Sequence, residues 1–223
     1  MHNVSRNKNA DLDRVLRAAT RVFLDRGFSA TSMSDLVAAT GMNRAGLYAA
    51  FGSKHQLYIT ALQRYRDDTE PELRAIARRA ADRDAEQPEN GVLGAIGELL
   101  DVVVRQSKEG GFIVRAAVEL ADDPATMRRV QDAWNDLERD LAAILARAVE
   151  RGEIAPAADP DRLARTALVF VQGALVTGRA DEDDGRLADA TAGLVDLLAS
   201  YSPSATAAPI RSQAADEALL NES

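Results

Sequence analysis

The chain has 223 residues and no cysteine, which excludes disulfide bonds, thiol catalysis and cysteine-based zinc sites. Hydrophobic residues make up 46% and charged residues 28%, a composition typical of a soluble globular protein. The net charge of −8 is unevenly spread, because residues 1–55 carry a net +4 and the remainder carries −12. A basic end on an acidic body indicates that this end faces an anionic partner such as nucleic acid.

Residues 1–9 are polar, and we expect them to form a disordered N-terminal arm. Residues 11–27 then predict a helix, because apolar side chains repeat at intervals of three and four and Gly27 can end the helix. Phe28 is expected to pack with Phe23 and Phe51 beneath the next two helices. Residues 10–55 therefore predict a small domain of three helices.

Two short helices separated by a glycine follow. Ser32 and Asp35 have the spacing of a capping box, which predicts the start of the first helix. Gly41 supplies the left-handed conformation that ends it, and Asn43 is a suitable cap for a helix over residues 44–51. The pattern is typical of a helix-turn-helix, whose second helix enters the DNA major groove. The same spacing also occurs in all-helical cores that bind no DNA.

A further helix begins after Gly52, where Ser53 and Gln56 again have capping-box spacing. Lys54 lies in the first turn of this helix, where its charge opposes the helix dipole. A cation at that place, together with the exposed amides of the helix start, favours a phosphate site. The alternative is an ordinary solvated lysine.

The run from Thr31-Ser32 through Gly41-Met42-Asn43-Arg44-Ala45-Gly46-Leu47-Tyr48 to Phe51-Gly52-Ser53-Lys54 resembles the signature of the TetR family of transcriptional regulators. The resemblance implies an all-α fold, a DNA-binding head and a helical body that binds a ligand and dimerises. It implies DNA-backbone contacts from Ser32, Tyr48 and Lys54, and base-edge contacts from Arg44, Ala45, Gly46 and Ala49. One departure is Ala50, where such proteins often carry a larger side chain, so base reading must depend mainly on Arg44.

Residues 56–201 are predicted to form the helical body. Helices are expected from residue 54 to Pro71, which breaks or restarts the helix, and over residues 72–84, 92–106, 112–120, 124–151, 160–178 and 185–201. Residues 85–91 predict a loop. Residues 202–223 are rich in Ser, Ala, Pro and Gln, and we expect a disordered tail.

The helix that starts at Pro160 is apolar around much of its circumference and must be covered on more than one side. It is either a central core helix or a helix shared between its own body and a second subunit. We favour a symmetric homodimer, because two recognition helices about 34 Å apart would read an inverted repeat. The expected interface residues are Leu168, Val171, Leu175, Leu194 and Leu198.

The family resemblance places an effector pocket among the helices of residues 56–151. Phe112, Trp134 and Phe170 are the candidate lining residues. Large apolar residues on helices are also common in plain cores, so each has that alternative. The body has few aromatic residues, which favours a mostly aliphatic pocket.

No catalytic residues, metal site or cofactor is expected, because neither His2 nor His55 belongs to a Ser–His–acid set or a metal-spaced cluster. No apolar run approaches the roughly 20 residues of a membrane span, and the N-terminus lacks the pattern of a signal peptide. We therefore expect a cytoplasmic repressor that leaves an inverted-repeat operator when a small-molecule effector binds. The alternative is a helical interaction protein without DNA binding.

Overall fold

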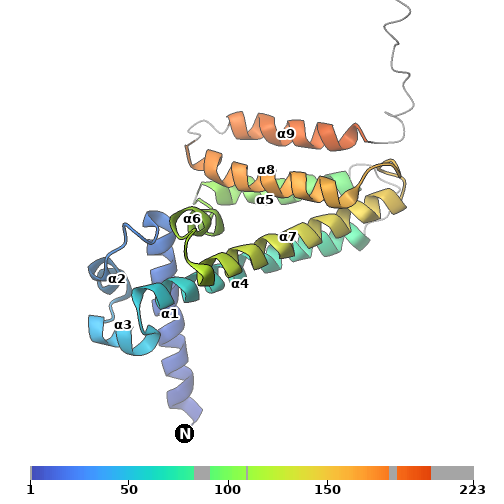
Figure 1. The fold of residues 1–223 in the computed structure, drawn as a ribbon. Helices are drawn as coiled ribbons and strands as arrows, with labels where there is room; N and C mark the ends of the chain where they lie inside the picture. The colour runs from blue at the N-terminus through green and yellow to red at the C-terminus, as the bar shows by residue number, and fades with distance from the viewer. Residues whose placement is uncertain (1, 83–90, 109, 181–184, 202–223) are drawn as a thin grey trace, which may run out of the picture.

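The computed structural model describes residues 2–82, 91–108, 110–180 and 185–201, and within these ranges all regular secondary structure is α-helical (Figure 1). The predicted all-α fold is therefore confirmed. The predicted tail and nearly all of the predicted 85–91 loop lie outside the described residues. The helices are α1 (His2–Arg26), α2 (Met33–Thr40), α3 (Arg44–Phe51), α4 (Lys54–Asp82), α5 (Val92–Ser107), α6 (Phe112–Glu119), α7 (Pro124–Glu150), α8 (Pro160–Ala180) and α9 (Gly185–Ala199).

The molecule has a head and a body, with α4 running from one to the other (Figure 1). The head consists of α1, α2, α3 and the first turns of α4, with α1 packed along α4. In the body, α7 packs on α8 and α5, and α9 covers α5 and α8 on the outside. The short helix α6 lies where the body meets the end of α1 (Figure 1).

The core of the head is partly aromatic. Phe23, Leu36 and Leu47 are buried, and Phe23 meets Tyr58 of α4 edge to face with 5.0 Å between ring centroids. Tyr58 also meets Phe112 of α6 in the same geometry at 5.1 Å. The head core therefore continues into α6, so a shift of α6 would change the packing of the head core.

The core of the body is mostly aliphatic and is formed by residues from the end of α4 and from α5, α7, α8 and α9. The helices approach closely where small residues allow it. A Cβ atom on Gly178 of α8 would overlap the side chain of Ser107 of α5, so a larger residue there would push the two helices apart.

Two helices differ from the sequence-based expectation. The structure begins α1 at His2, through residues that were expected to form a disordered arm. It also continues α4 through Pro71, so the predicted break there is wrong. Proline removes one backbone hydrogen bond, but packing can keep the helix going beyond it, and Ile76 is buried in the body core. None of the helices in the described part of the chain is long and apolar enough to cross a bilayer.

Candidate functional site

The helix-turn-helix is built by local caps that the sequence predicted, and each is present. The Ser32 hydroxyl accepts a hydrogen bond from the Asp35 amide at 3.1 Å, and the Asp35 carboxylate accepts from the Ser32 amide at 2.8 Å. Gly41 ends α2 with φ of +70°, a left-handed conformation that favours glycine. The Asn43 side chain accepts from the Gly46 amide at 2.7 Å and starts α3. These bonds fix the angle between α2 and α3.

The cap at Asp35 is also electrostatic. Hydrogen bonds from Ser32, followed by the charge of Arg26, hold the pKa of the Asp35 carboxyl below its usual value. Arg26 of α1 donates to this carboxylate at 2.7 Å. The start of α2 is therefore tied both to its own cap and to the neighbouring helix.

One face of α3 is buried and the other is open. Leu47 is only 1% exposed and anchors α3 on the head core. Arg44, Tyr48 and the alanines at 45, 49 and 50 are exposed, and the Arg44 guanidinium lies 5.8 Å from the centroid of the Tyr48 ring. The open face thus carries one cation and one phenol on a surface of small residues, which can approach a partner closely.

Gly46 has a second role that spacing alone did not indicate. A Cβ atom here would come within 2.9 Å of Cγ of Met42. Glycine at this position lets α3 begin tightly against the turn that follows α2. Gly46 is half-buried, whereas its predicted partners Ala45 and Ala49 are exposed.

The structure places Lys54 against the head. Its ammonium group lies 4.3 Å from the centroid of the Phe28 ring, a cation–π contact. Burial lowers the pKa of Lys54, while the charge of Glu119 acts in the opposite direction. Ser53 caps α4 as predicted, accepting from the Gln56 amide at 3.0 Å. Lys54 is thus held on the Phe28 ring beside the capped start of α4.

Long-range contacts that the sequence did not indicate hold the head on the body. The Glu119 carboxylate of α6 accepts hydrogen bonds from the amides of Phe28 at 2.6 Å and Ser29 at 3.1 Å. A Cβ atom on Gly27, whose φ is +81°, would overlap this carboxylate. These contacts define a joint between α6 and the segment that links α1 to α2.

Two arginines of the body complete the joint at the C-terminus of α1. Arg115 of α6 donates to the carbonyl oxygen of Asp25 at 2.8 Å, and Arg179 of α8 donates to the same oxygen at 3.0 Å. The last carbonyls of a helix lack partners within the helix and carry partial negative charge. The two cations meet both needs, so α6 and α8 together grip the end of α1.

A second link joins the start of α4 to α7. His55 Nε2 lies 3.0 Å from the Asp123 carboxylate, which also caps α7 by accepting from the Thr126 amide at 2.7 Å. Hydrogen bonds from Thr126, and then from His55, hold the pKa of Asp123 below its usual value. The cap of α7 is therefore also a contact with the head.

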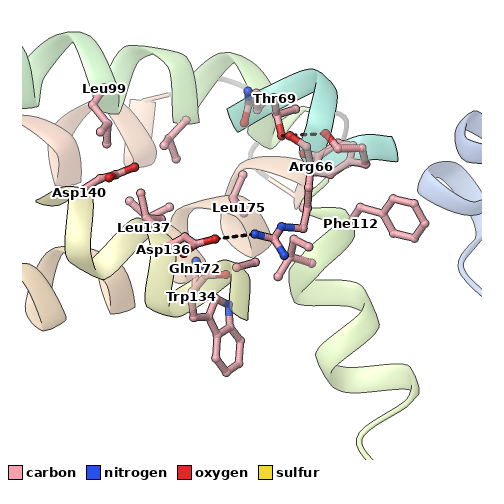
Figure 2. Close-up of a pocket in the computed structure, with 17 residues that line it drawn as sticks. Arg66, Thr69, Leu99, Phe112, Trp134, Asp136, Leu137, Asp140, Gln172 and Leu175 are labelled. Carbon is pink, nitrogen blue, oxygen red and sulfur yellow. Dashed lines mark hydrogen bonds and ion pairs between the residues drawn. The ribbon is translucent and has the colours of Figure 1, made fainter. Parts of the chain in front are cut away.

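The body contains a cavity of about 90 Å³ beside α6. Phe112 and Trp134 line it, as predicted (Figure 2). Phe170 does not, because it packs against the body core instead. The other lining residues come from α4, α5, α6, α7 and α8, together with Gly111 just before α6. The lining residues that the sequence did not indicate include Arg66, Asp136 and Gln172. These are polar residues on helices, and no local pattern showed that their side chains point inward.

The expected dimer-interface residues divide into two groups. Val171, Leu194 and Leu198 are buried in the core of their own chain, so their prediction as surface contacts needs correction. Leu168 and Leu175 are half-buried, and Leu175 also lines the cavity. The large apolar residues exposed on the described parts of α8 and α9 are instead Val169, Val176 and Leu197.

Comparison with known proteins gives consistent matches over both parts of the chain. Residues 15–61 match the bacterial regulatory proteins of the tetR family, and residues 92–194 match the tetracyclin repressor-like C-terminal domain. The transcriptional repressor ComR of Escherichia coli K12 is 29% identical over 180 residues, which cover 78% of this chain and 82% of ComR.

Solved structures agree in fold. A TetR regulator from Chloroflexus aurantiacus has a TM-score of 0.73 at 27% identity, covering 86% of this chain and 95% of that one. The regulator CifR, in complex with a 26-base-pair operator DNA, has a TM-score of 0.70 at 22% identity, covering 83% and 95%. The two matched regions, the capped helix-turn-helix and the helical body lead to one conclusion. The chain belongs to the TetR family of DNA-binding transcriptional regulators.

Proposed function

We propose that the protein is a homodimeric repressor that binds an inverted-repeat operator and is released by a small-molecule effector. The observation that carries the proposal is the open face of α3, where Arg44 and Tyr48 stand on a surface of small residues. ComR, a relative over most of the chain, is named a repressor. The basic head, with a net +4 over residues 1–55, supports attraction to DNA phosphates.

In this proposal α3 lies in the major groove. Arg44 makes the main contact with base edges, since an arginine can bind both O6 and N7 of guanine. Ala45, Gly46 and Ala49 bring the helix close to the bases, where alanine methyl groups can contact thymine methyl groups. Ser32 and Tyr48 contact the sugar–phosphate backbone, and Lys54 joins them after leaving the Phe28 ring.

We infer that the dimer forms through α8 and α9. Val169 and Val176 are 70% and 58% exposed and lie seven residues apart, on one face of α8. Gly173, also exposed, lies between them and would let a second helix approach closely. Leu197 of α9, 48% exposed, extends the apolar surface. Pairing of α8 and α9 with the same helices of a second subunit across a two-fold axis would bury Val169, Val176 and Leu197 in each subunit.

In this proposal, the joint between α6 and the α1–α2 segment transmits effector binding to the head and so releases the protein from DNA. Phe112 and Ile113 of α6 line the cavity, whereas Arg115 of the same helix binds the end of α1 and Glu119 binds the segment that follows it. A ligand that binds better when α6 has shifted would therefore favour a different head position. Two heads that lose their groove spacing can no longer bind both half-sites.

The direct test uses an operator selected from random duplexes with the full-length protein. We expect Arg44→Ala to weaken operator binding by tenfold or more, in line with about 1–3 kcal/mol for a bidentate base contact, and to relax sequence preference. Arg147→Ala removes the same charge from an exposed position on α7 and should change little. Equal binding by all three proteins to operator and scrambled duplex would refute the proposal.

The interface has its own test by analytical ultracentrifugation. Val169→Lys combined with Val176→Lys should convert dimer to monomer and weaken operator binding, because two charges would be buried on each side. Val118→Lys, at a valine that is 75% exposed on α6, is the matched control. A double variant that stays dimeric at micromolar concentration would move the interface elsewhere.

A further inference from the structure

The cavity in the body has two polar atoms with nothing to bind. The indole Nε1 of Trp134 on α7 and the side-chain Oε1 of Gln172 on α8 are buried and have no hydrogen-bond partner among the described residues. In Figure 2 both residues lie in the same part of the pocket, and the indole nitrogen is on the side of the ring nearest the other lining residues. Buried polar groups are nearly always paired, so an unpaired donor and an unpaired acceptor on two residues that line the same cavity indicate a missing ligand group.

Most of the remaining wall is apolar. Side chains from four helices contribute hydrocarbon surface, and these are Leu99, Val103, Phe112, Ile113, Ala133, Leu137, Val171 and Leu175. A ligand that fills this space must therefore present mainly hydrocarbon.

The ionic groups of the wall neutralise one another. Arg66 of α4 donates to the Asp136 carboxylate of α7 at 2.8 Å (Figure 2), and Arg139 donates to the other oxygen of the same carboxylate at 2.8 Å. Burial acts to raise the pKa of Asp136, but these two arginines outweigh it and hold the pKa below its usual value. Asp140, a further carboxylate on the wall, also has an interaction of its own. A charged ligand would thus enter an apolar space in which the arginine and Asp136 are already matched.

We propose that the cavity binds a neutral, mainly apolar small molecule with a hydroxyl group, which accepts from the Trp134 indole N–H and donates to the Gln172 side-chain carbonyl. A hydroxyl is the smallest neutral group that does both. This ligand class rests on the proposed function, since it describes the effector of the same cavity.

The size of the cavity links binding to movement. At about 90 Å³ it is smaller than the roughly 150 Å³ of an engineered cavity that holds benzene. A ligand larger than a few heavy atoms either extends out of the open side of the cavity or separates its walls, one of which is formed by α6. A ligand that separates the walls would shift α6, and this shift would strain the contacts of Arg115 and Glu119 with the end of α1 and the segment that follows it.

The test uses small probes that match the cavity and differ in one property. Butan-2-ol both donates and accepts, butan-2-one only accepts, protonated butan-2-amine is a cation and 2-methylpropanoate is an anion. The chain has a single tryptophan, so ¹⁵N-labelling of tryptophan gives one indole N–H signal that belongs to Trp134. We expect butan-2-ol to shift this signal saturably and to bind about fivefold more tightly than butan-2-one, the effect of one hydrogen bond. Both ions should bind at least tenfold more weakly than the alcohol.

Gln172→Leu separates the hydrogen bond from the shape of the pocket. This variant should bind butan-2-ol and butan-2-one equally, because the acceptor for the hydroxyl proton is gone. The matched control is Gln131→Leu, the same change at an exposed position on α7, which should keep the fivefold preference. A preference retained in Gln172→Leu, tighter binding of either ion, or no shift by any probe up to its solubility limit would overturn the proposal.

The same samples are assayed for operator binding with a larger hydroxylated ligand, cyclohexanol, against cyclohexanone. If the hydroxyl preference holds but operator affinity does not respond to either compound, the ligand class stands and the proposed effector release fails. If operator affinity falls equally with both compounds and Gln172→Leu changes neither response, release stands and the ligand class fails.

Discussion

The head and the body differ in where they place the polar side chains that could bind a partner. In the head the caps Ser32, Asp35 and Asn43 satisfy the helix ends internally, and the side chains presented to a partner, Arg44 and Tyr48, stand on the outer face of α3. In the body two buried polar atoms without a partner, Trp134 Nε1 and Gln172 Oε1, belong to residues that line the cavity. A head that can bind an external surface is thus joined to a body whose cavity can hold a small molecule.

The largest effect should come from removing one core leucine from each part. Leu47→Ala and Leu99→Ala should each lower the free energy of unfolding by about 2–5 kcal/mol. We expect the greater loss at Leu47, because Leu99 already borders the cavity and has fewer contacts to lose. Urea unfolding measures both. Leu47→Ala should also weaken operator binding beyond its loss of folded protein, since Leu47 anchors α3.

Leu99→Ala should weaken operator binding less than Leu47→Ala under conditions where both are folded, and the contradicting result is an equal loss. That result would mean that packing in the body, and not the seating of α3, sets DNA affinity.

A smaller effect separates the joint from the head alone. Gly27 and Gly41 both have positive φ, but a Cβ on Gly27 would overlap Glu119, whereas nothing lies within 4 Å of one on Gly41. Gly41→Ala should cost only the left-handed strain, about 1–2 kcal/mol. Gly27→Ala should cost about 2 kcal/mol more, because Glu119 must leave two backbone amides unpaired. Thermal unfolding of the two variants gives the difference, and equal costs would show that the joint contributes nothing.

The contrast between local and long-range contacts also explains what the sequence could reveal. The caps of α2, α3 and α4 connect residues three apart, and the left-handed Gly41 is a property of one residue, so the pattern predicted all of them. Phe112 and Trp134 were predicted as pocket residues through the family resemblance, and they line the cavity.

The joint could not be predicted, because Glu119 meets Phe28 across 91 positions of the chain. The side of α8 that is exposed could not be predicted either. This helix is apolar on most of its circumference, so periodicity does not tell whether Val171 or Val169 turns outward. Only the packing of α5, α7 and α9 decides that Val171 is buried and Val169 exposed.

The smallest expected effect concerns acid stability of the head. The folded-state pKa of Asp35 lies below its ordinary value, chiefly through hydrogen bonds from Ser32. The ionised carboxylate therefore stabilises the head above the ordinary pKa of about 3.8, and this contribution is lost as the pH falls through the folded-state pKa. Asp35→Asn should lower the melting temperature at pH 7 more than at pH 3. Asp101→Asn, an exposed carboxyl on α5, is the control. A difference that does not depend on pH would remove this role from Asp35.

The most direct measurement of the central claim is a hydroxyl-radical footprint of the full-length protein on its selected operator. We expect two protected segments related by an inverted repeat and about one helical turn apart, because two α3 helices of a dimer enter successive major grooves. Arg44→Ala should lose both segments at a protein concentration that saturates the wild type. A single protected segment, or an unchanged footprint with Arg44→Ala, would show that a pair of α3 helices does not read the operator in this way.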